Sequence, residues 1–486
     1  MTRVVLGDAW AALGDGITRI VLLDVTAVLS ASATLNSVAE AFSVPAASPV
    51  AIVAPAAPSA EQAAWAAATQ PQQNAQPQQD TQPQVDQPAD PQASRALTQL
   101  DDLASFSRAQ LASWASDPSA IADLLATQPA AAEVADWWSS TDASARTRLT
   151  AAVPEVVGNL EGVPYAVRDS ANRLFLDSQL SSIQRRLTDG SAGRAATEQL
   201  QAQLHMLQQV DAALETGESG LTRSLLNLDV AGGGRAVIAV GDLSSADYVS
   251  FLVPGMFYSV DSEIGSWADA ADQLAVDQSR WLSMLTPAQH SGPAQTVATV
   301  AWIGYQTPSV VNVASLDLAR EGRDALTRSL RGLDATRPAS AGAPYVSVLA
   351  HSYGATAALL ALQENDVTVD ALAMVGSPGS PAGNVGQLRV RNGNVWVADA
   401  ALDPIASTGV FGSQPLSAEY GAHHFGVGGA RDPLTGRELA GSVGHVDYFT
   451  AGSESFRNMA LIGIGQGRLV LDASGATAAA PRALAG

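Results

Sequence analysis

Apolar positions recur in two patterns along the chain, and the pattern changes near residue 222. From about Arg95 to Thr222 they repeat at three- and four-residue spacing, which predicts helices. Asp117–Pro118 and Ser139–Asp142 are predicted helix starts, because their side chains can cap a first turn. Residues 181–216 are predicted to form a long helix with a break near the glycines at 190 and 193. Trp137 and Trp138 are expected to pack in the core of this helical region.

After residue 222, short β-rich runs alternate with helical runs. The predicted helices cover residues 264–285, 315–333, 354–363 and 453–464, and the predicted strands cover residues 224–230, 235–240, 248–253, 296–305, 345–349, 371–375 and 395–398. Continuously apolar strands that alternate with helices favour a mostly parallel sheet covered on both faces. The predicted fold class is therefore α/β, preceded by an all-helical region.

The first 94 residues show neither pattern. Residues 48–94 are rich in Ala, Pro and Gln, a composition typical of a disordered linker. Within residues 1–47, the segment 19–33 combines a basic residue, an apolar run and a small-x-small end, as signal peptides do, but Asp24 interrupts the run. An amphipathic helix or a poorly ordered leader is the preferred interpretation of this segment, and cytoplasmic and exported locations both stay open. The predicted units are a leader (1–47), a linker (48–94), a helical domain (95–222) and a catalytic α/β domain (223–486).

Composition and charge exclude several kinds of function. The chain has 486 residues and a formal net charge of −21, so nucleic acids and anionic lipid head groups are not expected partners. Cysteine is absent, which excludes disulfides, thiolate catalysis and zinc–thiolate sites. No apolar stretch reaches the roughly 20 residues of a membrane span. The sequence shows no phosphate loop and no metal-ligand spacing, so no cofactor is predicted; Gly232–Gly234 are expected to form a hairpin turn.

One short motif points to a chemistry. Residues 350–354 read Ala-His-Ser-Tyr-Gly, between an apolar strand pattern and an apolar helix pattern. This arrangement is typical of a nucleophile elbow, a sharp turn that exposes a serine Oγ above an α/β sheet and needs tiny residues two positions before and after the serine. Ser352 is therefore the predicted nucleophile, and the alternative is an ordinary strand–helix turn.

A serine nucleophile needs a histidine base and a carboxylate that orients it, in the chain order Ser, acid, His on this fold. His445 is the preferred base because it lies in a loop just before the last helix, while His423 and His424 in a predicted strand (420–427) are alternatives. The side chain of His351 is expected to point away from the serine. Asp403 is the preferred acid, and Asp399 at the end of the preceding strand is the alternative.

Two further groups complete the predicted site. The N–H groups of Tyr353 and Met256 are the expected oxyanion donors, with Gly255 allowing the backbone to turn its N–H inward. Four aromatic residues nearby are candidates for a substrate wall and equally for plain packing: Phe257, Tyr258, Trp302 and Tyr305.

These motifs together resemble a known family. Residues 225–465 are similar to an α/β-hydrolase family common in actinobacteria and formerly catalogued as a domain of unknown function. The resemblance rests on LVPGM (252–256), WIGYQTP (302–308), AHSYG (350–354), VGSPG (375–379), VWVADAALDPI (395–405), GHVDYF (444–449) and GSESFRNMAL (452–461), with VPEVVGNLEGVPYAVRDSANR (153–173) matching the helical region that accompanies it. It implies a Ser–Asp–His hydrolase with Ser352, Asp403 and His445 in those roles. Ala350 departs from the usual first glycine of the elbow.

The predicted function is hydrolysis of a small-molecule or lipid carboxylic ester through an acyl-enzyme. An acyltransferase, an amidase or a peptidase would use the same triad, and a non-catalytic binding or delivery module would keep the fold with a vestigial site. The helical region is a candidate lid or protein-contact surface. The oligomeric state stays open.

Overall fold

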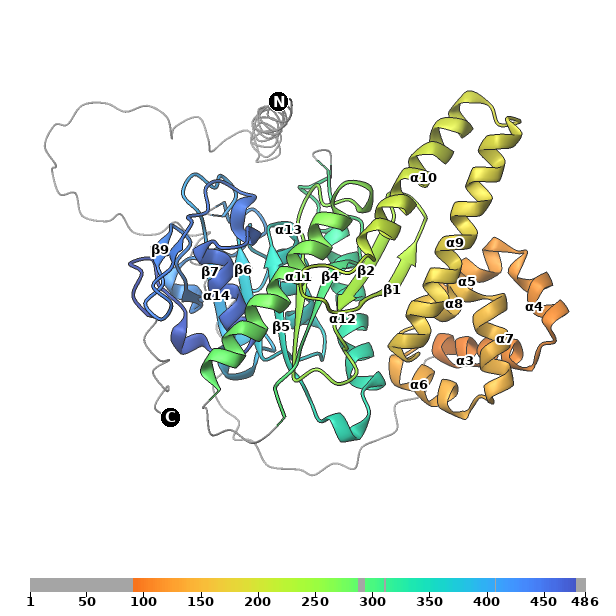
Figure 1. The fold of residues 1–486 in the computed structure, drawn as a ribbon, viewed down its shortest axis with the longest axis horizontal. Helices are drawn as coiled ribbons and strands as arrows, with labels where there is room; N and C mark the ends of the chain where they lie inside the picture. The colour runs from red at the N-terminus through yellow and green to blue at the C-terminus, as the bar shows by residue number, and fades with distance from the viewer. Residues whose placement is uncertain (1–90, 287–292, 310–311, 407, 478–486) are drawn as a thin grey trace, which may run out of the picture.

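The α/β part of the protein is built on one central β-sheet (Figure 1). The structure is a computed structural model that describes residues 91–286, 293–309, 312–406 and 408–477. The predicted leader, with its signal-like segment, and nearly all of the predicted linker lie outside these residues.

The strands of this sheet are β1 (Arg223–Asp229), β2 (Arg235–Val240), β3 (Tyr248–Val253), β4 (Val297–Ile303), β5 (Tyr345–His351), β6 (Ala371–Val375), β7 (Val395–Ala398) and β8 (His423–His424). They lie in the order β1-β2-β4-β3-β5-β6-β7-β8. β2 runs antiparallel to both of its neighbours, and from β4 to β8 all neighbours are parallel. The predicted mostly parallel sheet is confirmed, and Gly232–Gly234 lie in the β1–β2 turn as expected.

Helices cover both faces of the sheet. α11 (Val260–Leu285) and α14 (Glu454–Gly463) pack on one face, and α12 (Asp317–Thr336) and α13 (Tyr353–Glu364) pack on the other. Successive strand residues point to opposite faces, so Phe251 and Val348 join the α12–α13 core whereas Leu252 and Leu349 join the α11–α14 core. Burial on both sides explains why the strands are continuously apolar.

The helical region precedes the sheet and has its own core. Its helices are α3 (Pro91–Ser105), α4 (Arg108–Ala115), α5 (Pro118–Thr127), α6 (Ala131–Ser140), α7 (Ala143–Ala152), α8 (Pro154–Asn159), α9 (Tyr165–Asp189) and α10 (Arg194–Ala213). Trp137 and Trp138 are buried in this core, as predicted. α9 begins 16 residues earlier than the helix predicted from residue 181. The predicted break is present, and it joins α9 and α10 as a helical hairpin that Figure 1 shows beside β1.

Polar side chains of α8 and α9 cover the outer edge of β1. The Asn159 side chain accepts a hydrogen bond from the N–H of Leu228 (2.9 Å) and donates one to its carbonyl (3.0 Å). Asn172 and Asp169 do the same for the carbonyl and the N–H of Leu225. The unpaired backbone groups of an edge strand can pair with a strand of another protein molecule. These side chains occupy such groups on β1, as a ninth strand would, and they link the helical region to the sheet.

The structure differs from the sequence prediction at one strand. Residues 420–427 were predicted as a strand, but only His423–His424 pair with β7, because Ala418–Tyr420 form a 3₁₀ turn and Gly421 adopts a positive φ of 82°. A short hairpin follows, made of β9 (Ala430–Arg431) and β10 (Glu438–Leu439). The other 3₁₀ turns cover Ala339–Ala341, Val385–Gln387, Arg391–Gly393, Asp447–Phe449 and Gly467–Leu469. None of the helices in the described ranges is long and apolar enough to cross a membrane.

Candidate active site

Ser352 lies at the turn between β5 and α13 in a strained backbone conformation. Its φ and ψ are 54° and −128°, a region that a residue with a side chain occupies only when the surrounding structure enforces it. A Cβ on Gly354 would lie 2.3 Å from the carbonyl oxygen of Pro254, so this position tolerates no side chain. Ala350 is fully buried, and a methyl group fits there. The predicted nucleophile elbow therefore has the expected geometry.

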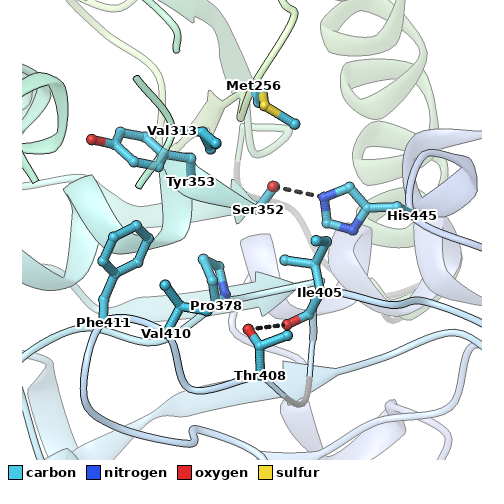
Figure 2. Close-up of a pocket in the computed structure, with 10 residues that line it drawn as sticks. All are labelled: Met256, Val313, Ser352, Tyr353, Pro378, Ile405, Thr408, Val410, Phe411 and His445. Atoms are coloured by element: carbon cyan, nitrogen blue, oxygen red, sulfur yellow. Dashed lines mark hydrogen bonds between the residues drawn. The ribbon is translucent and has the colours of Figure 1, made fainter. Parts of the chain in front are cut away.

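His445 and Asp403 lie in line with the Ser352 hydroxyl. His445 Nε2 is 2.7 Å from Ser352 Oγ, the contact drawn in Figure 2. On the other side of the ring, His445 Nδ1 is 2.9 Å and 3.0 Å from the two carboxylate oxygens of Asp403. Asp403 follows β7 and His445 precedes α14, so three loops at the carboxyl edge of the sheet meet at this point.

Asp403 is held as a carboxylate by several donors. Burial alone would raise its pKa, but hydrogen bonds and charge from His445, the Tyr448 hydroxyl and the N–H of Ile405 outweigh burial and lower the pKa. The Tyr448 hydroxyl donates to Asp403 Oδ2 at 2.5 Å and accepts the N–H of Ala400 at 2.8 Å. Burial and the neighbouring Asp403 raise the pKa of Tyr448, so its hydroxyl remains a donor. The sequence analysis missed Tyr448, although it lies only three residues after His445.

The His351 side chain points away from Ser352 Oγ, as expected, and contacts the backbone carbonyl of His445. Its Nε2 is 2.6 Å from the backbone carbonyl of His445 and must carry the proton, because a carbonyl only accepts. The two imidazole rings are 4.8 Å apart. His351 Nδ1 is buried without a partner. Burial, together with the proximity of His445, lowers the pKa of His351 to about 3. His351 thus stays neutral and anchors the loop that carries His445, a role that no local sequence signal indicates.

Two glycines bring backbone close to the reacting groups. A Cβ on Gly376 (φ 61°) would lie 2.9 Å from Asp403 Oδ2 and 3.0 Å from His445 Cε1. A Cβ on Gly255 would lie 2.5 Å from Ser352 Cβ. Gly255 was predicted as part of the site. Gly376 was not, although it lies in the VGSPG motif directly after β6.

The predicted oxyanion donors lie beside the serine. Tyr353 is the first residue of α13, so its N–H has no acceptor within the helix. Its ring turns away from Ser352, and its hydroxyl accepts the N–H of Ala319 at 3.0 Å. Met256 follows Gly255 in the loop after β3, and its side chain lies over Ser352 in Figure 2.

Comparison with known proteins identifies the fold of the α/β part of the chain. Residues 229–413 match the model of a family described as alpha/beta hydrolase. This part of the chain has the α/β-hydrolase fold. The family resemblance drawn from the motifs is confirmed, and His445 lies beyond the matched residues.

Two curated relatives come from Mycobacterium tuberculosis: the uncharacterized proteins MT2140 of strain CDC 1551 and Rv2079 of strain H37Rv. Each is 29% identical over 380 residues, which cover 69% of this chain and 56% of the relative. The chain thus matches just over half the length of these relatives.

Solved structures similar to the hydrolase fold include an esterase from Pyrobaculum calidifontis (12% identity, TM-score 0.33, 58% of this chain and 97% of that one). A serine hydrolase without lid from Xanthomonas campestris is 15% identical, with a TM-score of 0.30 and coverage of 50% and 94%.

A pocket opens over Ser352 in the hydrolase domain. It has a volume of about 350 Å³, part of it open to solvent, and its walls come from Met256, Val313, Ser352, Tyr353, Pro378, Ile405, Thr408, Val410, Phe411 and His445 (Figure 2). Apart from His445, no lining residue is a charged type. None comes from the helical region, so the candidate lid forms no wall of this pocket.

Several predicted site residues lie elsewhere in the hydrolase domain. Asp399 is exposed and His445 contacts Asp403 instead. His423 packs its ring against Trp396, with 4.9 Å between the centroids, and His424 is exposed. Neither histidine has a hydrogen bond to Ser352 Oγ among the described residues, whereas His445 contacts both Ser352 Oγ and Asp403.

The four aromatic candidates for a substrate wall do not line the pocket. Trp302 and Tyr305 are buried, and the Tyr305 hydroxyl donates to the carbonyl of Pro254 at 2.8 Å. Tyr258 packs edge-on against Trp267. Packing therefore explains these three residues. Phe257 is exposed at the rim of the site. Among the residues that the structure describes, no group of three or more His, Cys, Asp or Glu is arranged to hold a metal ion.

Proposed function

We propose that this protein is a serine hydrolase that cleaves uncharged carboxylic esters. The observation that carries the proposal is the hydrogen-bonded line from Asp403 through His445 to Ser352 Oγ, on a strained elbow below an apolar pocket. A serine hydroxyl is a weak nucleophile unless a base within hydrogen-bond reach takes its proton. The 2.7 Å contact between His445 Nε2 and Ser352 Oγ meets that requirement.

In the acylation step, Ser352 Oγ attacks the ester carbonyl carbon while His445 Nε2 takes the hydroxyl proton. Asp403 accepts the hydrogen bond of Nδ1–H and stabilises the imidazolium that forms. The N–H groups of Tyr353 and Met256 stabilise the negative oxygen of the tetrahedral intermediate. The intermediate then collapses: the C–O bond to the alcohol breaks, His445 gives its proton to the leaving alcohol, and the acyl group remains on Ser352.

Deacylation repeats the sequence with water. His445 Nε2 takes a proton from a water molecule, and the resulting hydroxide attacks the acyl carbon. When this second intermediate collapses, the bond to Ser352 Oγ breaks and His445 returns the proton to the serine. The carboxylic acid leaves. The cycle uses only side chains and backbone of this chain.

The pocket supports an uncharged, apolar acyl group. Met256, Val313, Ile405, Val410 and Phe411 supply apolar walls, with no acidic or arginine side chain among the lining residues. Burying a charged substrate group there without a partner would be unfavourable.

The test is hydrolysis of p-nitrophenyl esters from acetate to palmitate, with labelling by a fluorophosphonate probe. We expect wild type to turn over and Ser352→Ala and His445→Ala to lose about 10⁴-fold or more in kcat. The matched controls are His424→Ala and Asp399→Asn, which replace the alternatives from the sequence and are expected to retain activity. Ser352→Ala and His445→Ala should both lose the fluorophosphonate label, because the serine attacks the probe only when its base takes its proton, whereas the two control variants should keep it.

Other functions would give other outcomes. Transfer of the acyl group from Ser352 to added glycerol in place of water would indicate an acyltransferase, and faster cleavage of the matching anilides would indicate an amidase. A folded wild-type protein that neither hydrolyses any ester nor labels at Ser352 would reject the proposal and leave a non-catalytic module.

A further inference from the structure

Exposed large hydrophobic side chains gather around the pocket. The described residues include eight, and five of them either line the pocket or lie next to site residues in the chain. Val410 lines the pocket itself, and the others lie within two residues of Met256, Asp403 or His445. We call this set the apolar rim: Phe257, Leu402, Val410, Val443 and Val446.

Backbone contacts hold parts of this rim together. Ala401 and Val443 form an isolated parallel bridge, and the Gly444 N–H donates to the carbonyl of Ala401 at 2.9 Å. Leu402 and Val443 are therefore on adjoining segments, one carrying Asp403 and the other carrying His445. Val410 is the rim residue that also lines the pocket.

Two rim residues are exposed in spite of an unfavourable backbone. Phe257 has a φ of 68° and Leu402 a φ of 67°. L-residues rarely adopt this left-handed region, and glycine or asparagine would do so more easily. Leu402 is nevertheless 86% exposed to solvent. An apolar side chain that is strained and solvated gains nothing for folding, so its contribution must lie in a contact outside the folded chain.

Charges near the rim restrict the partner. The segments that carry it (254–258, 399–411 and 442–449) contain exposed Asp399 and Asp447 and no arginine or lysine. An anionic surface would be repelled, as the overall charge of −21 also requires. A neutral or zwitterionic apolar surface would be accepted.

We propose that the apolar rim docks on a neutral lipid–water interface and that the esters reaching Ser352 are acyl lipids drawn from it. The substrate part of this inference rests on the proposed ester hydrolysis. Val410 belongs both to the rim and to the pocket wall, and Leu402, Val443 and Val446 lie on the segments that carry Asp403 and His445, so a surface that covers the rim lies close to the serine. Immersing the rim removes apolar surface from water, which is the driving force of interfacial binding.

The docking test measures binding separately from catalysis. Ser352→Ala protein is mixed with phosphatidylcholine vesicles and with vesicles containing phosphatidylglycerol, and bound protein is measured by flotation. We expect binding to phosphatidylcholine and weaker binding to the anionic vesicles at low salt. Leu402→Asn, which suits the positive φ, should reduce the partition coefficient about tenfold. Adding Val443→Thr and Val446→Thr should bring the loss to about 100-fold.

The matched controls are Leu174→Gln on α9 and Met284→Gln near the end of α11. These side chains are 46% and 49% exposed, comparable to Val446 at 49%, but lie on elements that do not line the pocket. They should leave binding unchanged. No binding to phosphatidylcholine, tighter binding to the anionic vesicles, or equal losses in the controls would overturn the docking proposal.

A second measurement tests the lipid substrate. Wild-type hydrolysis of tributyrin is followed below and above its solubility limit, and the rate should rise more steeply when droplets form. A rate that follows only the dissolved concentration, in protein that cleaves p-nitrophenyl esters, overturns this inference and leaves the proposed function intact. If instead no soluble ester is cleaved and Ser352 is not labelled, ester hydrolysis itself fails, while the flotation result still decides the docking.

Discussion

His351→Gln is expected to make the protein more resistant to mild acid. Burial and the facing ring of His445 lower the pKa of His351 to about 3, against an ordinary value of 6.5. Its Nε2–H is committed to the carbonyl of His445, and a proton added to Nδ1 would find no acceptor. Asp403, Tyr258 and Tyr448 are the other titratable groups near this ring. The hydrogen bond to the His445 carbonyl and the charge of Asp403 favour the protonated ring, but burial and the His445 ring outweigh them and lower the pKa. A glutamine keeps an N–H donor but cannot take up a proton.

The sign of the effect follows from proton binding. Below pH 6.5 the unfolded chain protonates this histidine while the folded protein does not, so the unfolded state binds more protons and stability falls as pH falls. The stabilisation is complete above the unfolded pKa and is lost progressively toward pH 3. Over the roughly 1.5 pH units between pH 6.5 and pH 5, the free energy of unfolding falls by about 2 kcal/mol. His351→Gln removes this loss.

The assay is urea unfolding of wild type and His351→Gln at pH 7.5 and pH 5. Every other group titrates equally in both proteins, so the quantity of interest is the change in their difference between the two pH values. We expect the variant to gain about 2 kcal/mol relative to wild type on going to pH 5. His424→Gln, at an exposed histidine, serves as the control. A difference that does not change with pH would show that His351 titrates normally and that the reasoning is wrong.

Three other substitutions test separate parts of the structure. Asp403→Asn should lower kcat by about 10⁴-fold, since the histidine loses its orienting carboxylate, whereas Asp399→Asn should not; steady-state kinetics on one p-nitrophenyl ester compares them. Tyr448→Phe leaves the Ala400 N–H unpaired and frees one Asp403 oxygen, so it should lose about 1–3 kcal/mol in urea unfolding. Its kcat should fall about tenfold with little change in KM. Asn159→Ala should cost about 2 kcal/mol of stability at the β1 edge, with unchanged kcat per folded molecule.

The elbow was predictable because its signal is local. Ala350 and Gly354 lie two positions before and after Ser352, and a strand pattern and a helix pattern meet at this serine. Candidates for the acid and the base could be predicted from their positions in the chain, because the loops that follow parallel strands meet at one edge of the sheet. The sequence favoured Asp403 and kept Asp399 as the alternative, and in the structure Asp403 is the carboxylate that contacts His445.

Contacts between distant segments were not predictable. His351 acts through the backbone of a residue 94 positions away, and Tyr448 through the loop after β7. Likewise, nothing in the pattern of α9 shows that Asn172 would pair with the carbonyl of a sheet edge. Each depends on where two surfaces meet, which hydrophobic periodicity does not encode.

Backbone strain in this protein is concentrated at the site. Five non-glycine residues in the described ranges have positive φ. Gln128 caps the end of α5, and Asn392 tolerates this conformation in a turn. The other three follow β3, β5 and β7 at one edge of the sheet: Phe257, Ser352 and Leu402. The strained backbone at Ser352 directs its hydroxyl toward His445. The strained backbone at Leu402 instead holds an apolar side chain in solvent.

Relieving that strain should therefore stabilise the protein. Leu402→Asn is expected to raise the free energy of unfolding by about 1 kcal/mol in urea at pH 7.5, because asparagine adopts the left-handed region more easily than leucine. If the same variant binds phosphatidylcholine vesicles more weakly, the loss cannot be attributed to a damaged fold. A variant that is both less stable and weaker in binding would instead mean that Leu402 contributes to folding, and the argument from strain to docking would fail.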